Sequence, residues 1–320
     1  MSDRFPTAVM VLAAGRGERM RPLSDVLPKP ALPLPDGPVV ASALRLARAI
    51  GAAHVAVNVW HLADRMESAL TRAWMSSETI AVSRETSLMG TAGGLALARE
   101  RGLLGSEGPV LVLNGDSLYG LTLEPLIERC VSADDLVSLG LIPHPDPARW
   151  SRVLLDPAGR VTAIRRTTEP AHNEPEPCHY PGVMVVSREA LDALPMGPGS
   201  TPARLWEPAR AAGRLGGALL AGTWSEVGTP HDYLAAVRQR LAGRSEVDPT
   251  AVVDPSAHLH GSFVGERVQV NAGSTVTDSI VVCRARLGCD VRVHRSVLLG
   301  PVDIPDGELV EDTVRVADWP

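Results

Sequence analysis

Short apolar runs alternate with segments of helical periodicity over the first 240 residues or so. The runs predict strands at residues 9–12, 55–59, 110–113, 136–142 and 183–186. Between them, apolar residues recur at helical spacing in residues 40–50, 62–74 and 92–101. Because such alternation is typical of a parallel sheet covered by helices, the pattern predicts a doubly wound, Rossmann-like α/β domain over residues 1–240. Ligands of such sheets bind beyond the carboxyl ends of the strands.

The pattern changes near residues 241–247, where helical periodicity stops. Apolar residues then recur every six positions, and the series resumes after a slip of one residue. Its members are Val252, Val264, Val270, Val276, Val281, Leu287, Val293 and Leu299, with Ile304 and Val310 close to the register. Six residues form one side of a triangular coil, so residues 247–320 are predicted to form roughly four coils of a short left-handed parallel β-helix.

Composition narrows the class of protein. The chain has 320 residues, of which 45% are hydrophobic, and a net charge of −6. An acidic chain without a basic face argues against nucleic acid as the main partner. No apolar run approaches eighteen residues, and the N-terminus does not resemble a signal peptide, so we expect a cytoplasmic protein without a membrane partner. The cysteines form no CxxC pair and are expected to be reduced and structural: Cys130, Cys178, Cys283 and Cys289.

Local positive charge follows the first predicted strand. Residues 12–23 read LAAGRGERMRPL, and residues 28–30 read PKP. Glycines let backbone N–H groups approach anionic oxygens closely, and arginine and lysine side chains add positive charge, so the segment is typical of a phosphate-binding loop. It matches neither a Walker A loop, which has lysine directly after its last glycine, nor a GxGxxG fingerprint, because Arg19 and Met20 stand where the third glycine belongs.

The segment resembles the signature of the sugar-1-phosphate nucleotidyltransferases, LAAGxGTRLxPLT followed by PKP. Three further motifs follow in the family's order and at its approximate spacing: GTAGG at residues 90–94, VLNGD at 112–116 and WSEVGTP at 224–230. The resemblance implies that a sugar 1-phosphate attacks the α-phosphorus of a nucleoside triphosphate (NTP) in line and that pyrophosphate leaves. The attacking oxygen is already an anion, so the reaction needs alignment and charge stabilisation, and no general base.

The resemblance also implies roles for individual residues. Arg19 and the loop amides would hold the β and γ phosphates, and Lys29 would neutralise charge near the α-phosphate and the sugar phosphate. Asp116 and Glu226 would bind Mg²⁺, although Glu226 stands where the family has aspartate and its arm is one methylene longer. The resemblance assigns nucleotide contacts to Leu12, Ala13, Ala14, Gly15, Arg16, Gly17, Gly90, Thr91 and Asn114.

The sugar-binding segments depart from the family. Ser151 replaces the glycine of an R-Y-G-V-V segment, and Arg166 falls where the family has the lysine of Glu-Lys-Pro. We therefore expect Arg165 or Arg166 to bind the sugar phosphate. Gly182 lies in a strand that resembles the N-A-G-I strand of the same pocket. The sugar-phosphate contacts expected from the resemblance are Ser151, Arg166 and Gly182.

The sequence motifs are compatible with more than one pair of substrates. GTAGGLALA at residues 90–98 resembles the mannose-1-phosphate guanylyltransferases, which also carry a C-terminal β-helix, and favours GTP with mannose 1-phosphate or a related hexose or heptose phosphate. GERMR at residues 17–21 looks more like uridylyltransferases, and adenylyl transfer is also open. A non-catalytic regulator that binds nucleotide sugars is disfavoured, because such relatives usually lose the phosphate-binding residues that are present here.

The β-helix has two further interpretations. It could transfer an acyl group, with His258, His260 or His294 as the base, or it could form a subunit contact. We favour the subunit contact, because a stacked β-helix leaves strand edges that a second copy can cover, and so expect a homo-oligomer.

Overall fold

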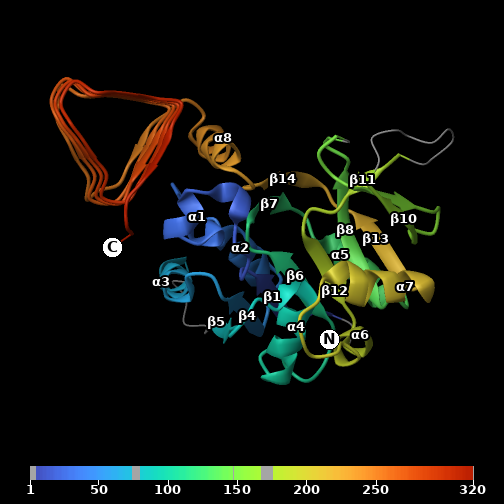
Figure 1. Cartoon of the computed structure of the whole chain (residues 1–320). Helices are drawn as coiled ribbons and strands as arrows, with labels where there is room; N and C mark the ends of the chain where they lie inside the picture. Colours follow the sequence, from blue (N-terminus) through green and yellow to red (C-terminus); the bar gives the residue numbers. More distant parts are fainter. Residues whose placement is uncertain (1–4, 74–79, 147, 167–175, 320) are drawn as a thin grey trace. The chain divides into compact units, whose positions relative to one another are not determined.

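The computed structural model describes residues 5–73, 80–146, 148–166 and 176–319, which form two compact units. The first, here called the sheet unit, comprises Met1–Gly15, Val40–His61 and Trp74–Ser225. The second, the β-helix unit, comprises Arg16–Val39, Leu62–Ala73 and Glu226–Pro320. Figure 1 colours the chain from blue at its N-terminus to red at its C-terminus. The short apolar runs predicted as strands and the segments of helical periodicity all form the expected type of element, with ends shifted by at most two residues.

The sheet unit is built on a mixed ten-stranded sheet. Its strand order is β10-β9-β11-β8-β12-β6-β1-β4-β5, and β13 pairs with β8. The strands are β1 (Ala8–Leu12), β4 (His54–Val59), β5 (Ile80–Arg84), β6 (Val110–Asn114), β8 (Val137–Pro143), β9 (Arg152–Leu155), β10 (Val161–Arg165), β11 (Cys178–His179), β12 (Val183–Val186) and β13 (Leu215–Leu219).

The predicted doubly wound α/β fold is confirmed. Strands β5, β4, β1 and β6 run parallel, whereas β12 lies antiparallel between β6 and β8. The apolar run at Val183–Val186 predicts a strand but carries no information on its direction, because direction depends on the connection that precedes the strand. A separate two-stranded sheet pairs β7 (Ser117–Leu121) with β14 (Gly222–Glu226).

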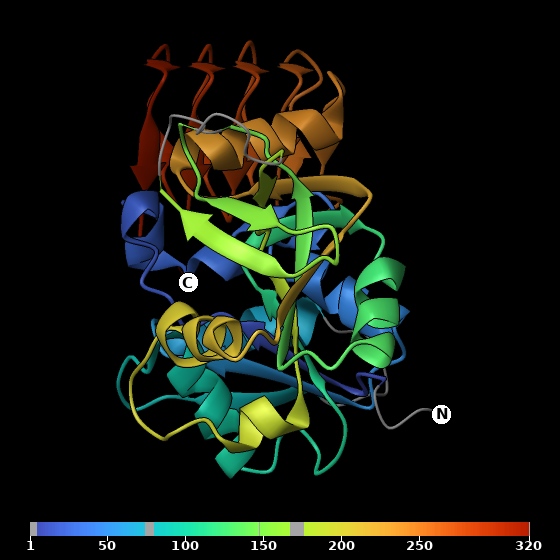
Figure 2. The same cartoon turned by 90° about the vertical axis from the view of Figure 1, so that its right-hand side faces the viewer.

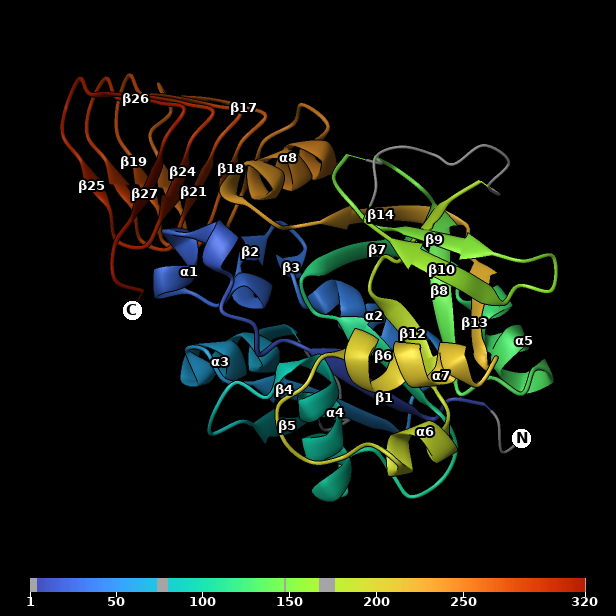
Figure 3. The same cartoon turned by 45° about the vertical axis from the view of Figure 1, so that its right-hand side comes forward.

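Helices cover this sheet and complete its core. Helices α2 and α4 pack against β1, α5 packs against β8, β12 and β13, and α4 contacts α6, as Figure 3 shows. Fully buried side chains such as Met10, Leu95, Val112 and Met184 fill the space between the layers. The helices of the sheet unit are α2 (Ala41–Ala49), α4 (Gly90–Glu100), α5 (Glu124–Ser132), α6 (Arg188–Asp192), the π-helix η3 (Pro202–Trp206) and α7 (Glu207–Ala211).

The β-helix unit contains more than the C-terminal repeat. Helix α3 contacts η2 and β3, and α1 contacts β27, the last strand of the β-helix. Among the described residues, no helix is both long and apolar enough to cross a membrane. The elements outside the coils are η1 (Glu18–Met20), α1 (Leu23–Val26), η2 (Lys29–Ala31), β2 (Pro33–Leu34), β3 (Gly37–Pro38), α3 (Ala63–Ala73) and α8 (Pro230–Leu241). The predicted end of α3 at Trp74 lies outside the described residues.

The C-terminal repeat forms the predicted left-handed parallel β-helix. Figure 1 shows its triangular section and Figure 2 shows its stacked coils from the side. Three parallel sheets form the faces, and four full coils and the final strand β27 lie in the described residues. One face contains β15 (Glu246–Val247), β18 (Phe263–Val264), β21 (Ile280–Val282), β24 (Val297–Leu299) and β27 (Val314–Val316). The second contains β16 (Val252–Val253), β19 (Gln269–Val270), β22 (Arg286–Leu287) and β25 (Asp303–Ile304). The third contains β17 (His258–His260), β20 (Thr275–Thr277), β23 (Arg292–His294) and β26 (Leu309–Glu311).

One position of the predicted apolar series is wrong. Val252 is 65% exposed, and Val253 packs against the interior in its place. Leu299 is fully buried as predicted, although its neighbour Leu298 is the residue that belongs to the interior cluster. The reason is the length of a coil: paired residues in successive coils, such as Val264 and Val281, lie 17 positions apart, so each coil contains one short side and the slip recurs in every coil.

A column of serines stabilises one corner of the β-helix. The Ser262, Ser279 and Ser296 side chains are almost fully buried. The Oγ of Ser279 accepts a hydrogen bond from the N–H of Ser296 at 3.1 Å and donates to the carbonyl oxygen of Thr277 at 2.6 Å. Ser262 and Ser296 make the same two kinds of contact. The column therefore supplies acceptors for backbone N–H groups at this corner, whereas the carbonyl oxygens that it contacts also accept an N–H from the next coil.

We expect Ser279→Ala to destabilise the β-helix. The substitution leaves the buried N–H of Ser296 without its acceptor, which costs about 1–3 kcal/mol. Ser245→Ala is the matched control, because Ser245 stands at the partly exposed outer end of the column, where its hydrogen bond with the N–H of Ser262 is less buried. The free energy of unfolding, measured in guanidinium, should fall more for Ser279→Ala than for Ser245→Ala. Equal losses would contradict the role of the column.

Candidate active site

The carboxyl ends of three parallel strands place candidate residues in one row. In the register of β1 with its neighbours, Leu12 pairs with Asn58 of β4 on one side and with Asn114 of β6 on the other. The chain leaves the sheet directly after Leu12 and Asn114. The segment that follows Leu12 and the segment that contains Asp116 therefore start from neighbouring points of the same sheet edge, where ligands of parallel sheets bind.

Backbone contacts hold the first of these segments. The N–H of Ala13 donates to Asn58 Oδ1 at 2.8 Å, and the N–H of Gly115 donates to the carbonyl oxygen of Leu12 at 2.9 Å. A Cβ atom on Gly115 would lie 3.0 Å from that oxygen and crowd it, so glycine favours this close approach. Ala14 is buried, whereas Gly15 is exposed and has open space where a Cβ would point. Hydrogen bonds thus fix the loop where it leaves the sheet, and the loop becomes accessible to solvent at Gly15.

Asn114 and Gly182 are fixed against each other. The N–H of Asn114 donates to the carbonyl oxygen of Gly182 at 2.8 Å, and the Tyr119 hydroxyl donates to the carbonyl oxygens of both residues at 3.0 and 3.1 Å. Gly182 has a φ of +88°, and a Cβ there would lie within 2.7 Å of three side-chain atoms of Asn114. The close contact between Asn114 and Gly182, two of the expected ligand-binding residues, therefore requires glycine at position 182.

Asp116 follows β6 and is half-buried. Burial, with a smaller contribution from the Asp116 charge, raises the pKa of Tyr119 well above its ordinary value, so this hydroxyl keeps its proton and remains a donor. A carboxylate at this edge has the ligand chemistry that Mg²⁺ prefers. In the described part of the chain, no group of three or more His, Cys, Asp or Glu side chains is placed to hold a metal ion.

Gly90 and Thr91 begin helix α4. Gly90 has a φ of +69°, and a Cβ there would lie 2.7 Å from the carbonyl oxygen of Gly199. The Thr91 hydroxyl accepts a hydrogen bond from the N–H of Thr201 at 2.8 Å. The start of α4 is thus held by the segment that contains Gly199 and Thr201, a contact that the sequence did not predict.

In the β-helix unit, Gly17 and Lys29 lie together. Gly17 has a φ of +65°, and its carbonyl oxygen accepts hydrogen bonds from the N–H of Met20 and from the Ser24 hydroxyl, both at 2.8 Å. A Cβ on Gly17 would lie 3.2 Å from that of Ser24 and 3.4 Å from that of Lys29. Lys29 is 7% exposed, which is unusual for lysine. The compact turn after Gly17 therefore holds the lysine in place.

Arg19 and Glu226 form an ion pair within the same unit. The guanidinium Nη2 lies 2.7 Å from Oε1 of Glu226, and the side chains are 63% and 15% exposed. The resemblance assigns Arg19 to phosphate and Glu226 to metal, and it gives no reason to expect that the two residues contact each other. Arg16, by contrast, is exposed and lies 3.8 Å from Glu18.

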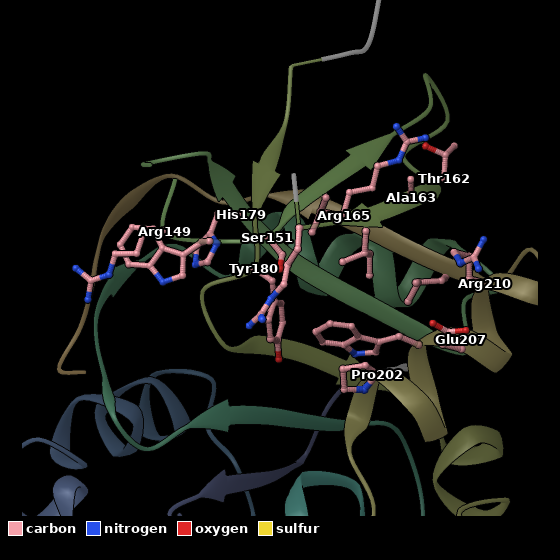
Figure 4. Close-up of a pocket in the computed structure, with 16 residues that line it drawn as sticks. Arg149, Ser151, Thr162, Ala163, Arg165, His179, Tyr180, Pro202, Glu207 and Arg210 are labelled. Carbon is pink, nitrogen blue, oxygen red and sulfur yellow. The ribbon is translucent and has the colours of Figure 1, made fainter. Parts of the chain in front are cut away.

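A cavity of about 690 Å³ in the sheet unit contains two of the expected sugar-phosphate residues, Ser151 and Arg166. Figure 4 shows Arg149 on one side of His179 and Tyr180, and Arg210 with Glu207 on the other. The remaining lining residues are Trp150, Val153, Thr162, Ala163, Ile164, Arg165, Pro202, Trp206 and Leu215. Gly182 does not line this cavity but follows Tyr180 by two positions.

Aromatic rings form one wall of this cavity, and the sequence analysis missed them. The ring centroids of Trp150 and His179 are 5.2 Å apart, and those of Tyr180 and Trp206 are 4.8 Å apart. Trp224 packs on His179 at 4.7 Å. A signal was present: aromatic residues make up only 3% of the chain, and several of them gather here. Aromatic faces with polar groups between them are typical of ligand pockets.

Comparison with known families identifies the domains. The model of the "Nucleotidyl transferase" family matches residues 8–243, which is most of the chain. The model described as "GlmU-like, C-terminal hexapeptide" matches residues 235–314. The second match agrees with the coils of the β-helix and with the repeat from which they were predicted.

Curated relatives match over most of their length. The chain is 29% identical to a mannose-1-phosphate guanylyltransferase of Mycobacterium tuberculosis over 310 residues, which cover 96% of this chain and 80% of that protein. It is 26% identical to mannose-1-phosphate guanylyltransferase 1 of Arabidopsis thaliana over 301 residues, which cover 89% and 82%.

A solved structure shares the fold. The crystal structure of HddC from Yersinia pseudotuberculosis matches with a TM-score of 0.59 at 21% identity, covering 72% of this chain and 98% of that one. At this level of identity the likeness supports the architecture of the chain and carries no information on its substrate.

We expect Gly182→Ala to disturb Asn114. An alanine would be strained at this positive φ, at a cost of about 1–3 kcal/mol, and its Cβ would push the Asn114 side chain away. Gly102→Ala is the matched control, because Gly102 has a φ of +68° and a Cβ there would meet no described atom within 4 Å. With Mg²⁺ present, NTP should raise the melting temperature of Gly102→Ala as in the unchanged protein, and of Gly182→Ala much less. An equal rise in both variants would refute this prediction.

Proposed function

The chain belongs to the nucleotidyl transferase family, and on this basis we propose that it joins an NTP to a sugar 1-phosphate, giving a nucleoside diphosphate sugar and pyrophosphate. GTP with mannose 1-phosphate or a related hexose or heptose phosphate is the favoured pair, because the relatives that match over most of the chain are named mannose-1-phosphate guanylyltransferases. The observation that carries the proposal is the row at the carboxyl edge of β1 and β6, from which the segment after Leu12 and the segment with Asp116 start.

The proposed chemistry uses an oxygen that is already charged. An oxygen of the sugar phosphate attacks the α-phosphorus, the bond from that phosphorus to the bridging oxygen breaks, and pyrophosphate leaves with the electron pair. Arg19 and the backbone from Leu12 to Gly17 would hold the β and γ phosphates, and Lys29 would stabilise charge near the α-phosphate. Triphosphate would then replace the Glu226 carboxylate, which lies 2.7 Å from the Arg19 guanidinium, as the partner of this arginine.

A divalent metal ion is general in this family, and Mg²⁺ is our proposal for this chain. Asp116 and Glu226 fit it by their chemistry, because Mg²⁺ takes one or two carboxylates together with phosphate oxygens and water. When bound, the ion would neutralise charge on the phosphates. Asp116 is half-buried and Glu226 is 15% exposed, so neither residue is fully buried.

The aromatic cavity of the sheet unit is the proposed sugar pocket. Ser151 and Arg166 line it, and Gly182 lies two positions beyond Tyr180 of its wall. A cavity of about 690 Å³ falls within the usual range for small-molecule sites. Arg166 would bind the sugar phosphate in place of the family's lysine, and the Trp150 and Trp206 rings would pack against the sugar.

The decisive test is a grid of NTPs against several sugar 1-phosphates, with Mg²⁺ and pyrophosphate release as the readout. We expect one strong combination, with GTP and mannose 1-phosphate favoured over uridylyl or adenylyl transfer. Asp116→Ala should lower its rate about 100-fold or more. Asp134→Ala, which removes an exposed carboxylate beside Arg214, is the control and should leave the rate unchanged. Within the same grid, Arg166→Ala should raise the KM for the sugar phosphate and leave the KM for NTP unchanged.

A grid without activity would refute the proposal. If nucleotide sugars then still raised the melting temperature, the chain would be a binding regulator rather than an enzyme.

We further propose that residues 1–240 form the catalytic domain and that residues 247–320 serve as a subunit contact of a cytoplasmic homo-oligomer. Among the residues that the structure describes, the strands of the first coil pair on one side only, and Val247 and Val252 of this coil are 39% and 65% exposed. Light scattering should give a mass above the 33.9 kDa of one chain, and Val252→Arg should lower it. A mass of one chain for the unchanged protein would contradict the proposal.

A further inference from the structure

A chain of buried hydrogen bonds crosses the sheet unit beside the candidate nucleotide segments. Asn58 Oδ1 accepts the N–H of Ala13 at 2.8 Å, and Asn58 Nδ2 donates to Glu85 Oε1 at 2.8 Å. Glu85 Oε2 then accepts the N–H of Met89 at 3.0 Å. Two side chains therefore connect the residue after β1 with the residue before α4.

Both side chains lie in the protein interior. Asn58 is 3% exposed and Glu85 is 4% exposed. Helix α4 approaches them at Gly94, where a Cβ would lie 2.6 Å from Asn58 Nδ2 and 2.7 Å from Glu85 Oε1. Burying a carboxylate and an amide is unfavourable unless both are hydrogen-bonded, so the sheet unit keeps a costly arrangement at this place.

Only one orientation of the Asn58 amide is consistent with these hydrogen bonds. A carboxylate accepts only, so Asn58 must turn its amide nitrogen towards Glu85 and its oxygen towards Ala13. With the amide flipped, its nitrogen would face the N–H of Ala13 and its oxygen would face the carboxylate. The Glu85 charge therefore fixes the orientation of Asn58, which in turn fixes the peptide that begins the first loop.

We propose that Asn58 and Glu85 are positioning residues for nucleotide binding. This inference rests on the proposed function. Ala13 is followed by Ala14 and Gly15, and Met89 by Gly90 and Thr91, all of which are proposed nucleotide contacts. The two side chains touch neither substrate; they hold the two backbone segments in one mutual arrangement, so that the N–H groups after Ala13 and Met89 are oriented before the NTP arrives.

Isosteric substitutions test the direction of the hydrogen bonds without changing shape. Asn58→Asp places a carboxylate against the Glu85 carboxylate. Glu85→Gln places an NH₂ group against either Asn58 Nδ2 or the N–H of Met89. The double variant restores every contact with one bond reversed: the new carboxylate at position 58 would accept from Ala13 and from the new amide at position 85, whose oxygen would accept from Met89.

The readout is the Kd for NTP from calorimetry, with Mg²⁺ and without turnover, alongside the melting temperature. We expect each single variant to raise the Kd about tenfold, which corresponds to the loss of one buried hydrogen bond, and the double variant to return it to within about threefold. The KM for the sugar phosphate should stay within about twofold. Ser138→Ala, which removes a buried hydroxyl that contacts Asp135, is the control for lost stability alone.

The outcomes distinguish the positioning role of Asn58 and Glu85 from the proposed reaction. Single variants that bind NTP like the unchanged protein would overturn the positioning role, and so would a double variant that binds no better than the weaker single. If a single variant does not fold, the double variant decides, because only a restored network returns both folding and the Kd. A protein that binds NTP with this pattern but is inactive in the substrate grid would refute the proposed reaction and leave the positioning role intact.

Discussion

The parallel register of β4, β1 and β6 is the constraint on which the candidate site depends. It sets Asn58, Leu12 and Asn114 side by side, so the segments that follow Leu12 and Asn114 leave the sheet at the same edge. The Asn58 side chain of β4 accepts a hydrogen bond from the first of these segments. A shift of β4 by one residue would turn all its side chains to the opposite face of the sheet and separate the Ala13 N–H from its acceptor on Asn58. Glycines act on the same edge: a Cβ would crowd the backbone at Gly115 and would clash with the Asn114 side chain at Gly182.

The Glu85 and Glu226 carboxylates are stabilised in two different ways. In the sheet unit the Glu85 carboxylate is buried and accepts two N–H hydrogen bonds, so it stabilises a fixed arrangement of the backbone. In the β-helix unit the Glu226 carboxylate faces Arg19, whose side chain is mostly exposed. An exposed partner can be exchanged at little cost, whereas a buried network cannot, because separating its members leaves polar atoms without hydrogen bonds. The buried hydrogen bonds of Glu85 are suited to fixing the backbone, and the exposed Arg19–Glu226 ion pair is suited to accepting a ligand.

Local patterns in the sequence predicted much of the fold. Strands and helices of the sheet unit followed from apolar runs and helical spacing, and the β-helix followed from its repeat. The coil length of 17 residues was harder to predict, because His258 and other polar residues interrupt the apolar series, which displaced the predicted interior from Val253 to Val252. The antiparallel direction of β12 depends on connections rather than on composition. Asn58 and Glu85 were missed because their partners lie 45 and 27 positions away, a separation that no local pattern records.

The boundary between the compact units does not follow the boundary between the sequence patterns. Gly17, Arg19 and Lys29 belong by their contacts to the same unit as the C-terminal coils, and helix α1 of that segment packs on β27, the last strand of the chain. A protein cut before residue 247 would therefore lose a packing surface for the turn that carries Arg19 and Lys29. In evolutionary terms, the repeat is not an appendage that can be lost or exchanged without changing the catalytic part, because a segment of that part packs on its final coil.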